Sequence, residues 1–367
     1  ESDEEKAEVL QTFFTSVFTE EPDIENIPKL PMKDVQFDFE QLVVTEKKVM
    51  EKLNKIKISK APGPDGIHPR VYSETKEILV RPLTMIFRDS LVSQELPTEW
   101  KEAHITPIFK KGKKTVAGNH RPVSLTCIAC KLMESLIRDH VFDYMKVNDL
   151  FSDKQYGFIS GRSTSLQLLT VLDKWSQMLD AGNSIDIIYM DYQKAFDKVP
   201  HLRLLGKLES YGVTNEVLGW IRAFLSGRKQ KVVINGSSST WAPVTSGVPQ
   251  GSVLGPILFV IYINDLPDLL NSPTYLFADD TKLFQEITCV EDRVKLQEDL
   301  TRAEQWSRTW LLSFNKQKCN VLPVKNKHED PEYYMGAESG ERVKLDLSRS
   351  EKDIGVYIDT DLKFDTH

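Results

Sequence analysis

The 367-residue sequence has few cysteines and no long hydrophobic run. Its longest nearly apolar stretch, residues 253–263, is far shorter than the roughly 20 residues that cross a bilayer. The four cysteines, Cys127, Cys130, Cys289 and Cys319, are too few for a disulfide scaffold and are typical of a reducing compartment. The chain starts with Glu-Ser-Asp-Glu-Glu, so this end predicts no targeting segment. We therefore expect no membrane partner.

The sequence lacks the motifs that mark several other classes of protein. The Cys127-x-x-Cys130 pair has no second pair and falls in an apolar helical stretch, so it indicates packing and not zinc binding. The seven histidines include no His-Glu-x-x-His pattern, and no phosphate-binding loop of the P-loop type is present. A content of 40% hydrophobic and 28% charged residues is ordinary for a folded protein and excludes general disorder.

The net charge of −7 is unevenly distributed along the chain. Residues 1–26 carry −8 and residues 328–367 carry −6, which leaves +7 on residues 27–327. A basic body can bind a polyanion although the whole protein is acidic. Within it, residues 101–114 are rich in lysine, although lysine runs are more often simply solvated. A second candidate basic patch consists of Arg222, Arg228, Lys229 and Lys231.

The hydrophobic pattern predicts an α+β fold. Helical spacing covers residues 46–58, 125–146 and 165–180, and an acidic amphipathic segment within residues 1–26 predicts a short docking helix. Strands are expected at residues 185–192, in a hairpin around Asn235-Gly236, in two short runs around Asp279-Asp280, and near residues 354–358. Helices mixed with antiparallel hairpins favour α+β over a regular alternation of parallel strands.

Three carboxylates stand at the ends of predicted strands. Asp279 and Asp280 are adjacent between two hydrophobic runs, and Asp191 ends another apolar strand. Adjacent carboxylates repel one another unless a cation lies beside them, and Mg²⁺ prefers oxygen ligands. Taken alone, an Asp-Asp pair more often forms an ordinary turn. The residues around it favour the metal site.

Several segments then show a family resemblance. Residues 189–199 (Tyr-Met-Asp-Tyr-Gln-Lys-Ala-Phe-Asp-Lys-Val), 247–259 (Gly-Val-Pro-Gln-Gly-Ser onward) and 275–281 (Tyr-Leu-Phe-Ala-Asp-Asp-Thr) resemble, in order and spacing, the three palm motifs of reverse transcriptases. The residues of these motifs are similar to those in non-long-terminal-repeat (LINE-type) retrotransposons, and most similar to those of the jockey-like branch. Further matching segments are residues 105–112, 119–125, 155–164, 314–319 and 352–357.

The resemblance implies an RNA-directed DNA polymerase. Such an enzyme extends a DNA 3′-end on an RNA template, using dNTPs and two metal ions, and in this family the primer is typically nicked target DNA. Asp191 and Asp279 are then the principal ligands of Mg²⁺, or of Mn²⁺, and Asp280 is the supporting carboxylate. Lys318 matches the position that protonates the departing pyrophosphate, with an ordinary surface lysine as the alternative.

The resemblance also implies contacts to the incoming nucleotide. Phe196 matches a steric gate whose ring excludes a ribose 2′-hydroxyl, although simple packing is the alternative. Gln250 lies in a Pro-Gln-Gly turn whose backbone N–H groups suit an anion. Arg121 and Lys110 match residues that hold the β- and γ-phosphates. The complete set of expected substrate-binding residues is Lys110, Arg121, Tyr192, Phe196, Gln250 and Gly251.

The implied architecture is the fingers and palm of a right-hand polymerase, with an antiparallel palm sheet and packed helices. We expect an extension and linker at 1–45, fingers with part of the palm at 46–180, the catalytic palm at 181–326, and palm strands at 327–367 leading to an absent thumb. The family's setting implies a nuclear and cytoplasmic ribonucleoprotein, while the oligomeric state stays open. The main alternative is a catalytically inactive nucleic-acid-binding remnant; a group II intron or telomerase type of enzyme and a two-metal nuclease fit the motifs less well.

Overall fold

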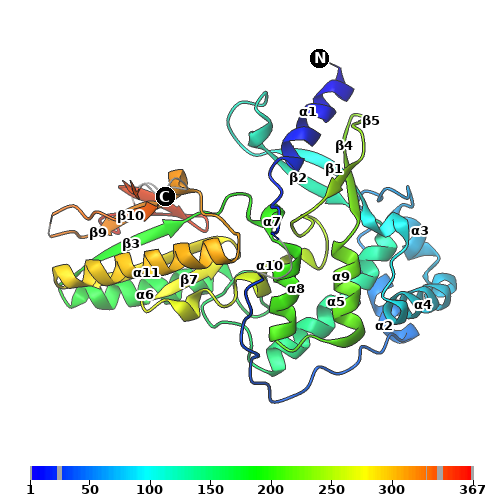
Figure 1. The fold of residues 1–367 in the computed structure, drawn as a ribbon, viewed down its shortest axis with the longest axis horizontal. Helices are drawn as coiled ribbons and strands as arrows, with labels where there is room; N and C mark the ends of the chain where they lie inside the picture. Colours follow the sequence, from blue (N-terminus) through cyan, green and yellow to red (C-terminus); the bar gives the residue numbers. More distant parts are fainter. Residues whose placement is uncertain (1, 23–26, 328, 337–341, 365–367) are drawn as a thin grey trace. The chain divides into compact units, whose positions relative to one another are not determined.

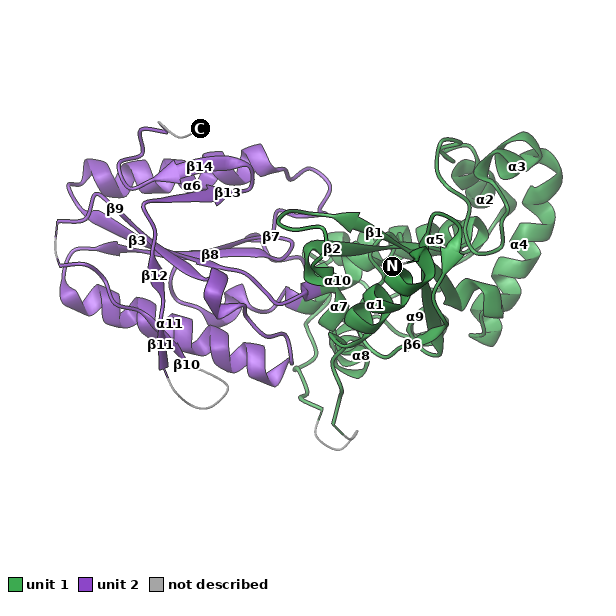
Figure 2. Ribbon diagram, turned by 90° about the horizontal axis from the view of Figure 1, so that it is seen from above, with its two compact units in different colours: residues 1–150, 196–262 green, residues 151–195, 263–367 purple. Residues whose placement is uncertain are grey.

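The computed structural model describes residues 2–22, 27–327, 329–336 and 342–364. It confirms the expected mixture of helices and largely antiparallel sheets (Figure 1). The chain forms two compact units, coloured separately in Figure 2, and each is built from two separate stretches. Unit 1 comprises residues 1–150 and 196–262, and unit 2 comprises residues 151–195 and 263–367.

Unit 1 contains a five-stranded sheet. Its order is β2 (His120–Leu125), β1 (Glu102–Phe109), β4 (Arg228–Ile234) and β5 (Ser237–Ser238), with β6 (Ala242–Val244) also beside β4. β1 and β4 are parallel and the other pairs are antiparallel. The predicted hairpin turn at Asn235-Gly236 is present, and both residues have the positive φ, 48° and 88°, that a tight two-residue turn requires.

One face of this sheet is covered by α1 (Asp3–Thr15), which confirms the predicted docking helix (Figure 1). The helix begins with a capping box between Ser2 and Glu5. Its apolar side packs on inward-facing strand residues; the buried members of this cluster are Ala7, Leu10, Phe14, Ala103, Ile105 and Val232. Part of the acidic N-terminal segment, residues 1 and 23–26, lies outside the described residues.

The other helices of unit 1 include those expected at residues 46–58 and 125–146. They are α2 (Glu46–Leu53), α3 (Pro69–Glu74), α4 (Lys76–Ser93), α5 (Ile128–Val147), α8 (His201–Ser210) and α9 (Asn215–Leu225). The helix expected over residues 46–58 is shorter, because the chain turns after Asn54. α10 (Gly255–Ile263) is apolar on all sides and is buried, as such a helix must be.

The sheet of unit 2 has the order β12, β9, β3, β8, β7. The strands are β3 (Ser184–Met190), β7 (Thr274–Phe277), β8 (Asp280–Ile287), β9 (Asn320–Val324) and β12 (Asp346–Leu347). β3 lies in the middle and runs antiparallel to both β8 and β9. This position brings the end of β3 beside the start of β8.

Two helices, α6 (Thr164–Asp180) and α11 (Val290–Thr309), lie on opposite faces of this sheet (Figure 2). α6 begins at the predicted cap, Ser163, and buries Val171 and Trp175 against the strands. A hairpin of β13 (Ser350–Asp353) and β14 (Val356–Asp359) packs through Ile358 into the same hydrophobic cluster as α6. A small antiparallel sheet of two strands, β10 (Tyr334–Gly336) and β11 (Arg342–Lys344), follows α11 in the chain.

Two predicted absences can be compared with the described part of the chain. None of its helices combines the length and apolar composition that crossing a membrane demands. Cys127 and Cys130 are buried and free, so the interpretation as packing residues is confirmed.

Candidate active site

The Asp279-Asp280 pair lies in a tight turn between β7 and β8. Phe277 pairs with Asp280 as the last rung of this hairpin, which leaves Ala278 and Asp279 as the turn residues. Ala278 has φ +54°, a left-handed conformation that an alanine adopts at an energetic cost and keeps only where its surroundings impose it.

Gln155 supplies that constraint. Its side chain is fully buried, and its Oε1 atom accepts hydrogen bonds from the backbone N–H groups of Ala278 (2.9 Å) and Gly157 (2.7 Å). Leu276, two residues before the turn, exchanges backbone hydrogen bonds with Lys154 and Tyr156 and accepts another from Gln167 Nε2. The segment containing Gln155 was expected to be a motif, but its sequence gave no sign that this amide supports the carboxylate turn.

Gly157 allows the two segments to approach. A Cβ atom at this position would lie 2.3 Å from the backbone nitrogen of Ala278, closer than any real contact. The glycine is therefore required by a close approach of two backbones.

Asp191 follows the last residue of β3. Met190 pairs with Thr281, so Asp191 lies next to Asp280 on the neighbouring strand. The backbone oxygen of Asp191 accepts a hydrogen bond from Asn315 N at 2.7 Å. Lys318 Nζ lies 3.5 Å from both carboxylate oxygens of Asp191, and both side chains are about half exposed. The structure thus brings Lys318 to the carboxylates.

The carboxylates influence one another electrostatically. Burial, together with the negative charges of Asp279 and Asp191, raises the pKa of Asp280 to about 6. Asp353 adds to this effect, while Lys282 opposes it. Such a concentration of negative charge favours a bound cation, which would stabilise the ionised forms.

A metal ion at this position would need additional ligands. Within the described residues, no three His, Cys, Asp or Glu side chains are grouped closely enough to hold a metal ion alone. Mg²⁺ in nucleotide-handling sites is commonly held by one or two carboxylates, waters and substrate phosphates instead of a protein cage. The donor chemistry of Asp191, Asp279 and Asp280 fits this arrangement.

A cavity of about 120 Å³ opens beside these residues. It is bordered by Asp191, Asp280 and Lys318, and also by Lys352 and Asp353 of the β13–β14 hairpin. Its lining is strongly charged, with both signs present. The cavity has room for several water-sized groups.

Tyr192 is placed differently from the other candidate residues. Its ring is buried and stacks on Phe314, with ring centroids 4.6 Å apart. Burial raises the pKa of its hydroxyl. The side chain therefore serves packing, and only the backbone of Tyr192 is left for a substrate contact.

In unit 1, Phe196 and Gln250 lie on neighbouring segments. Backbone hydrogen bonds join residues 196–199 to the loop at 247–251, from Val248 N to Phe196 O (2.7 Å) and from Gly247 N to Val199 O (2.8 Å). The Phe196 ring is half-buried and stacks on Phe259, with centroids 4.5 Å apart. The structure brings the two candidate residues together.

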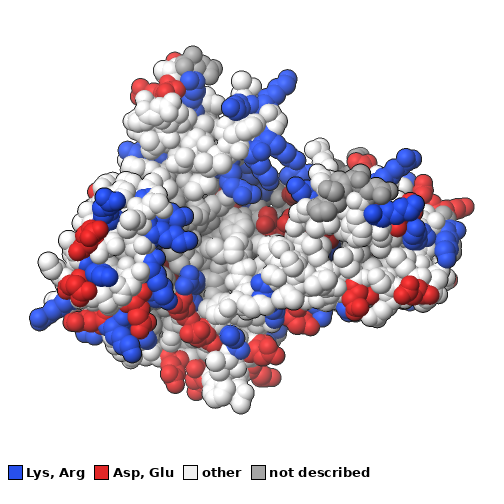
Figure 3. Space-filling view, turned by 180° about the vertical axis from the view of Figure 1, so that it is seen from behind, with Lys and Arg blue, Asp and Glu red and all other residues white. Residues whose placement is uncertain are grey.

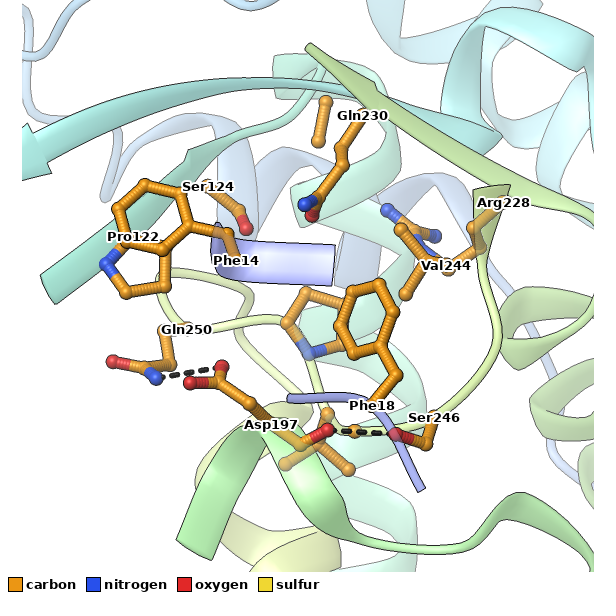
Figure 4. A pocket seen from close by; sticks show the side chains of 14 residues that line it. Phe14, Phe18, Pro122, Ser124, Asp197, Arg228, Gln230, Val244, Ser246 and Gln250 are labelled. Carbon is orange, nitrogen blue, oxygen red and sulfur yellow. Dashed lines mark hydrogen bonds between the residues drawn. The ribbon is translucent and has the colours of Figure 1, made fainter. Parts of the chain in front are cut away.

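Gln250 is held at both its backbone and its side chain. Its carbonyl oxygen accepts from Ser124 N at 2.7 Å, and its Nε2 atom donates to Asp197 Oδ1 at 2.8 Å (Figure 4). Gly251 has φ +109°, and a Cβ atom there would lie 2.6 Å from Ser124 O. Both observations explain a glycine directly after Gln250.

Lys110 and Arg121 lie at the end of the β1–β2 hairpin where residues 110–119 connect the two strands. Both side chains are exposed; Arg121 pairs with Ile108 across the hairpin, and Lys110 N donates to Asn119 O. Figure 3 shows Lys and Arg side chains gathered in groups on the surface. These two residues are available to an anion.

The prediction of a second basic patch is wrong for one of its residues, Arg228. Arg228 is only 2% exposed and donates to Phe224 O at 3.1 Å, with its guanidinium over the Phe224 ring. The cause is strand alternation: Arg228 and Gln230 face inward, while Lys229 faces the solvent. The surface patch is therefore smaller than the sequence indicated.

Comparison with known proteins places this chain in a family. Residues 108–338 match the family described as reverse transcriptase (RNA-dependent DNA polymerase). The match includes all three carboxylates, Lys318 and the Gln250 loop. The chain belongs to the reverse transcriptase family.

Curated relatives come from mobile elements. The RNA-directed DNA polymerase from mobile element jockey of Drosophila funebris is 31% identical over 336 residues, 88% of this chain and 36% of that protein. The probable RNA-directed DNA polymerase from transposon BS of Drosophila melanogaster is 29% identical over 352 residues, 92% of this chain and 37% of that protein. The corresponding X-element protein of the same fly is 29% identical over 317 residues, 84% of this chain and 34% of that protein. This chain spans little more than a third of the length of these relatives.

Proposed function

We propose that this chain is the polymerase portion of a LINE-type retrotransposon protein and extends a DNA 3′-end on an RNA template. The observation that supports this most directly is the placement of Asp191 beside the Asp279-Asp280 turn on neighbouring strands. The names of the relatives, all RNA-directed DNA polymerases of mobile elements, support the same reaction. Nicked target DNA is the proposed source of the primer.

Asp191, Asp279 and Asp280 are the proposed ligands of Mg²⁺, with Mn²⁺ as a substitute. Mg²⁺ bound there would favour ionisation of the attacking 3′-hydroxyl and neutralise charge on the departing pyrophosphate. The three carboxylates would bind the metal ion and orient it. Gln155 keeps the Asp279-Asp280 turn in one conformation. Substrate phosphate oxygens would complete a ligand set that the described residues do not supply alone.

Lys318 is the proposed proton donor to the leaving pyrophosphate. Its ammonium lies 3.5 Å from Asp191, so it is held at the carboxylates before substrate binds. An ammonium group there can transfer a proton from Nζ to a phosphate oxygen as the bond to the α-phosphorus breaks.

Most of the proposed nucleotide contacts belong to unit 1, and Tyr192 lies in unit 2. Phe196 limits the space for a 2′-hydroxyl, and the Gln250-Gly251 turn presents an amide and backbone N–H groups to the nucleotide. Arg121 and Lys110 supply positive charge for the triphosphate. Tyr192 contributes its backbone.

We retain the right-hand arrangement as a proposal, with fingers at residues 46–180, palm at 181–326 and further palm strands at 327–367. The last three residues, 365–367, where a thumb was expected to be missing, lie outside the described part of the chain. The nuclear and cytoplasmic ribonucleoprotein setting and the association with RNA also belong to this proposal.

Primer extension tests the proposal. Wild-type protein, an oligo(dT) primer annealed to poly(rA), dTTP and Mg²⁺ should give extended products. Asp279→Asn should reduce the rate by at least a thousand-fold, since a metal ligand is lost. Asp180→Asn is the matched control, because this exposed carboxylate ends α6 near the start of β3. Binding of primer–template without extension by wild-type protein would favour the inactive remnant.

A further inference from the structure

The Gln250 side chain is held in one orientation by Asp197. Its Nε2 atom donates to Asp197 Oδ1 at 2.8 Å, which turns the amide oxygen Oε1 away from the carboxylate (Figure 4). A carboxylate only accepts hydrogen bonds, so the flipped amide would place two acceptors against one another. Asp197 therefore determines which amide atom Gln250 presents.

Asp197 is itself fixed by a chain of hydrogen bonds. Its backbone oxygen accepts from Ser246 Oγ at 2.8 Å, and the same hydroxyl oxygen accepts from Thr19 N at 2.8 Å. Thr19 Oγ1 also donates to Lys198 O at 2.9 Å. A continuous path thus runs from the segment that follows α1 to the amide of Gln250.

The chain is anchored on both sides of Thr19. On the N-terminal side, Phe14 near the end of α1 is buried and Phe18 is half-buried. Both side chains line a small cavity of about 30 Å³ that also borders Asp197 and Gln250 (Figure 4). Behind it, the Glu21 carboxylate accepts from Leu202 N (2.7 Å) and Arg203 N (3.2 Å) at the start of α8.

The anchor at Glu21 is a buried ion pair. Arg203 Nη1 lies 3.2 Å from Glu21 Oε1, and both side chains are at most one-tenth exposed. A carboxylate at the first turn of a helix also satisfies N–H groups that lack partners within the helix. The segment is therefore bound firmly at Phe14 and Glu21, with Thr19 between them.

We propose that residues 14–21, named here the brace, position the loop at residues 247–251, which contains Gln250. In this proposal Asp197 is a positioning residue that sets the orientation of the Gln250 amide. The inference rests on the proposed function, because it assumes that Gln250 meets the incoming nucleotide. In this arrangement Gln250 Oε1 is an acceptor for a donor group of that nucleotide, and the brace keeps it in place.

The first test separates nucleotide binding from folding. Asp197→Ala should raise the KM for dNTPs by about ten-fold, the effect of losing one hydrogen bond to a charged partner, while primer–template affinity stays unchanged. Ser246→Ala and Thr19→Val should change KM in the same direction by smaller factors. Thr84→Val is the control, because Thr84 lies in α4, outside the brace, and its Oγ1 donates only to Val80 O of the same helix among the contacts described.

A reciprocal exchange keeps the test informative where a single variant folds poorly. Gln250→Glu alone places two carboxylates 2.8 Å apart and should raise KM strongly. Adding Asp197→Asn lets the new amide donate to the new carboxylate, and should restore most of the lost dNTP affinity. A purely structural role for Asp197 predicts no such rescue.

The outcomes distinguish the two hypotheses. A wild-type protein that extends no primer overturns the proposed function, and this inference fails with it. A wild-type protein that extends primers, with Asp197→Ala and Ser246→Ala variants that keep its KM, overturns the inference alone. A raised KM in both variants, an unchanged Thr84→Val control and rescue in the exchanged pair support it.

Discussion

Lys282 and Asp353 form a buried ion pair that joins β8 to the β13–β14 hairpin. Both side chains are 4% exposed, and Lys282 Nζ donates to both oxygens of the Asp353 carboxylate. Tyr189 of β3 donates its hydroxyl to the same carboxylate at 3.3 Å. The hairpin that borders the candidate active-site cavity is thereby fixed to the two strands that carry Asp191 and Asp280.

This ion pair predicts a large effect of removing one partner. Lys282→Met should lower the free energy of unfolding by about 3–5 kcal/mol, because Asp353 is left as a buried charge without its ammonium. The double variant Lys282→Met, Asp353→Leu should recover much of the loss, since no isolated charge remains. Urea unfolding of the three proteins measures both effects. Equal stability of the single variant and wild type would contradict the ion pair.

Gly157 predicts a steric effect at the carboxylate turn. Gly157→Ala should destabilise the protein by about 1–3 kcal/mol and impair primer extension, because the new methyl group meets the backbone of Ala278. Gly206→Ala is the matched control. Apart from the neighbouring residues and the backbone of the helix itself, no atom lies within 4 Å of a Cβ at Gly206, which is inside α8. The free energy of unfolding of this variant should therefore rise by about 0.5–1 kcal/mol. Thermal unfolding of both variants tests the contrast.

The steric gate gives a prediction about sugar selection. Phe196→Ala should raise incorporation of rNTPs relative to dNTPs by at least about ten-fold, because the ring no longer occupies the space of a 2′-hydroxyl. Phe196→Tyr retains the ring and should keep the wild-type preference. Competition assays with one labelled nucleotide of each kind supply the ratio. An unchanged ratio in the alanine variant would assign Phe196 to packing against Phe259.

Metal binding should depend on the nucleotide. Mg²⁺ alone should raise the unfolding temperature only slightly, because the described residues provide no complete ligand cage. Mg²⁺ together with a dNTP and primer–template should raise it further, by binding to the native state alone, and EDTA should reverse the gain. Asp279→Asn should lose most of the combined effect. Equal stabilisation of this variant would place the metal elsewhere.

His201 predicts a pH dependence of stability. Its ring nitrogen Nε2 lies 2.8 Å from Gly247 O, and burial lowers its pKa below the ordinary 6.5. Glu21 acts in the opposite direction and Arg228 adds to the lowering. The unfolded chain therefore binds the proton more readily, so stability is complete above pH 6.5 and is lost as the pH falls below it.

The size of this pH effect is limited by linkage. The free energy of unfolding should fall by up to about 1.4 kcal/mol per pH unit until His201 is protonated in the folded protein. His201→Gln keeps a side-chain donor for Gly247 without titrating, so the difference between it and wild type isolates this residue from other titrating groups. Parallel pH profiles of the two proteins would contradict the assignment.

The sequence predicted those features that depend on local pattern. The hairpin at Asn235-Gly236, the cap at Ser163 and the two strands around Asp279-Asp280 all follow from alternation, turn residues and capping preferences. The three carboxylates could be proposed because the residues around them match the palm motifs, whereas an Asp-Asp pair alone more often forms an ordinary turn.

Features that depend on tertiary packing could not be predicted. The direction of Arg228 was hidden because both faces of β4 carry polar residues, so alternation gave no contrast. The stacking of Tyr192 on Phe314 joins residues more than 120 positions apart, and no local pattern reports it. The support of Ala278 by Gln155 is of the same kind.

The division of each unit between two stretches of chain has a consequence for synthesis on the ribosome. β1 ends at Phe109 but pairs in parallel with β4, which begins at Arg228, so the sheet of unit 1 must wait for more than a hundred further residues. β3 likewise waits for β8 and β9. Until then the strand edges stay open to other chains, and such non-local pairing is slow. The nascent protein therefore depends on protection from aggregation until Val324, the end of β9, has emerged.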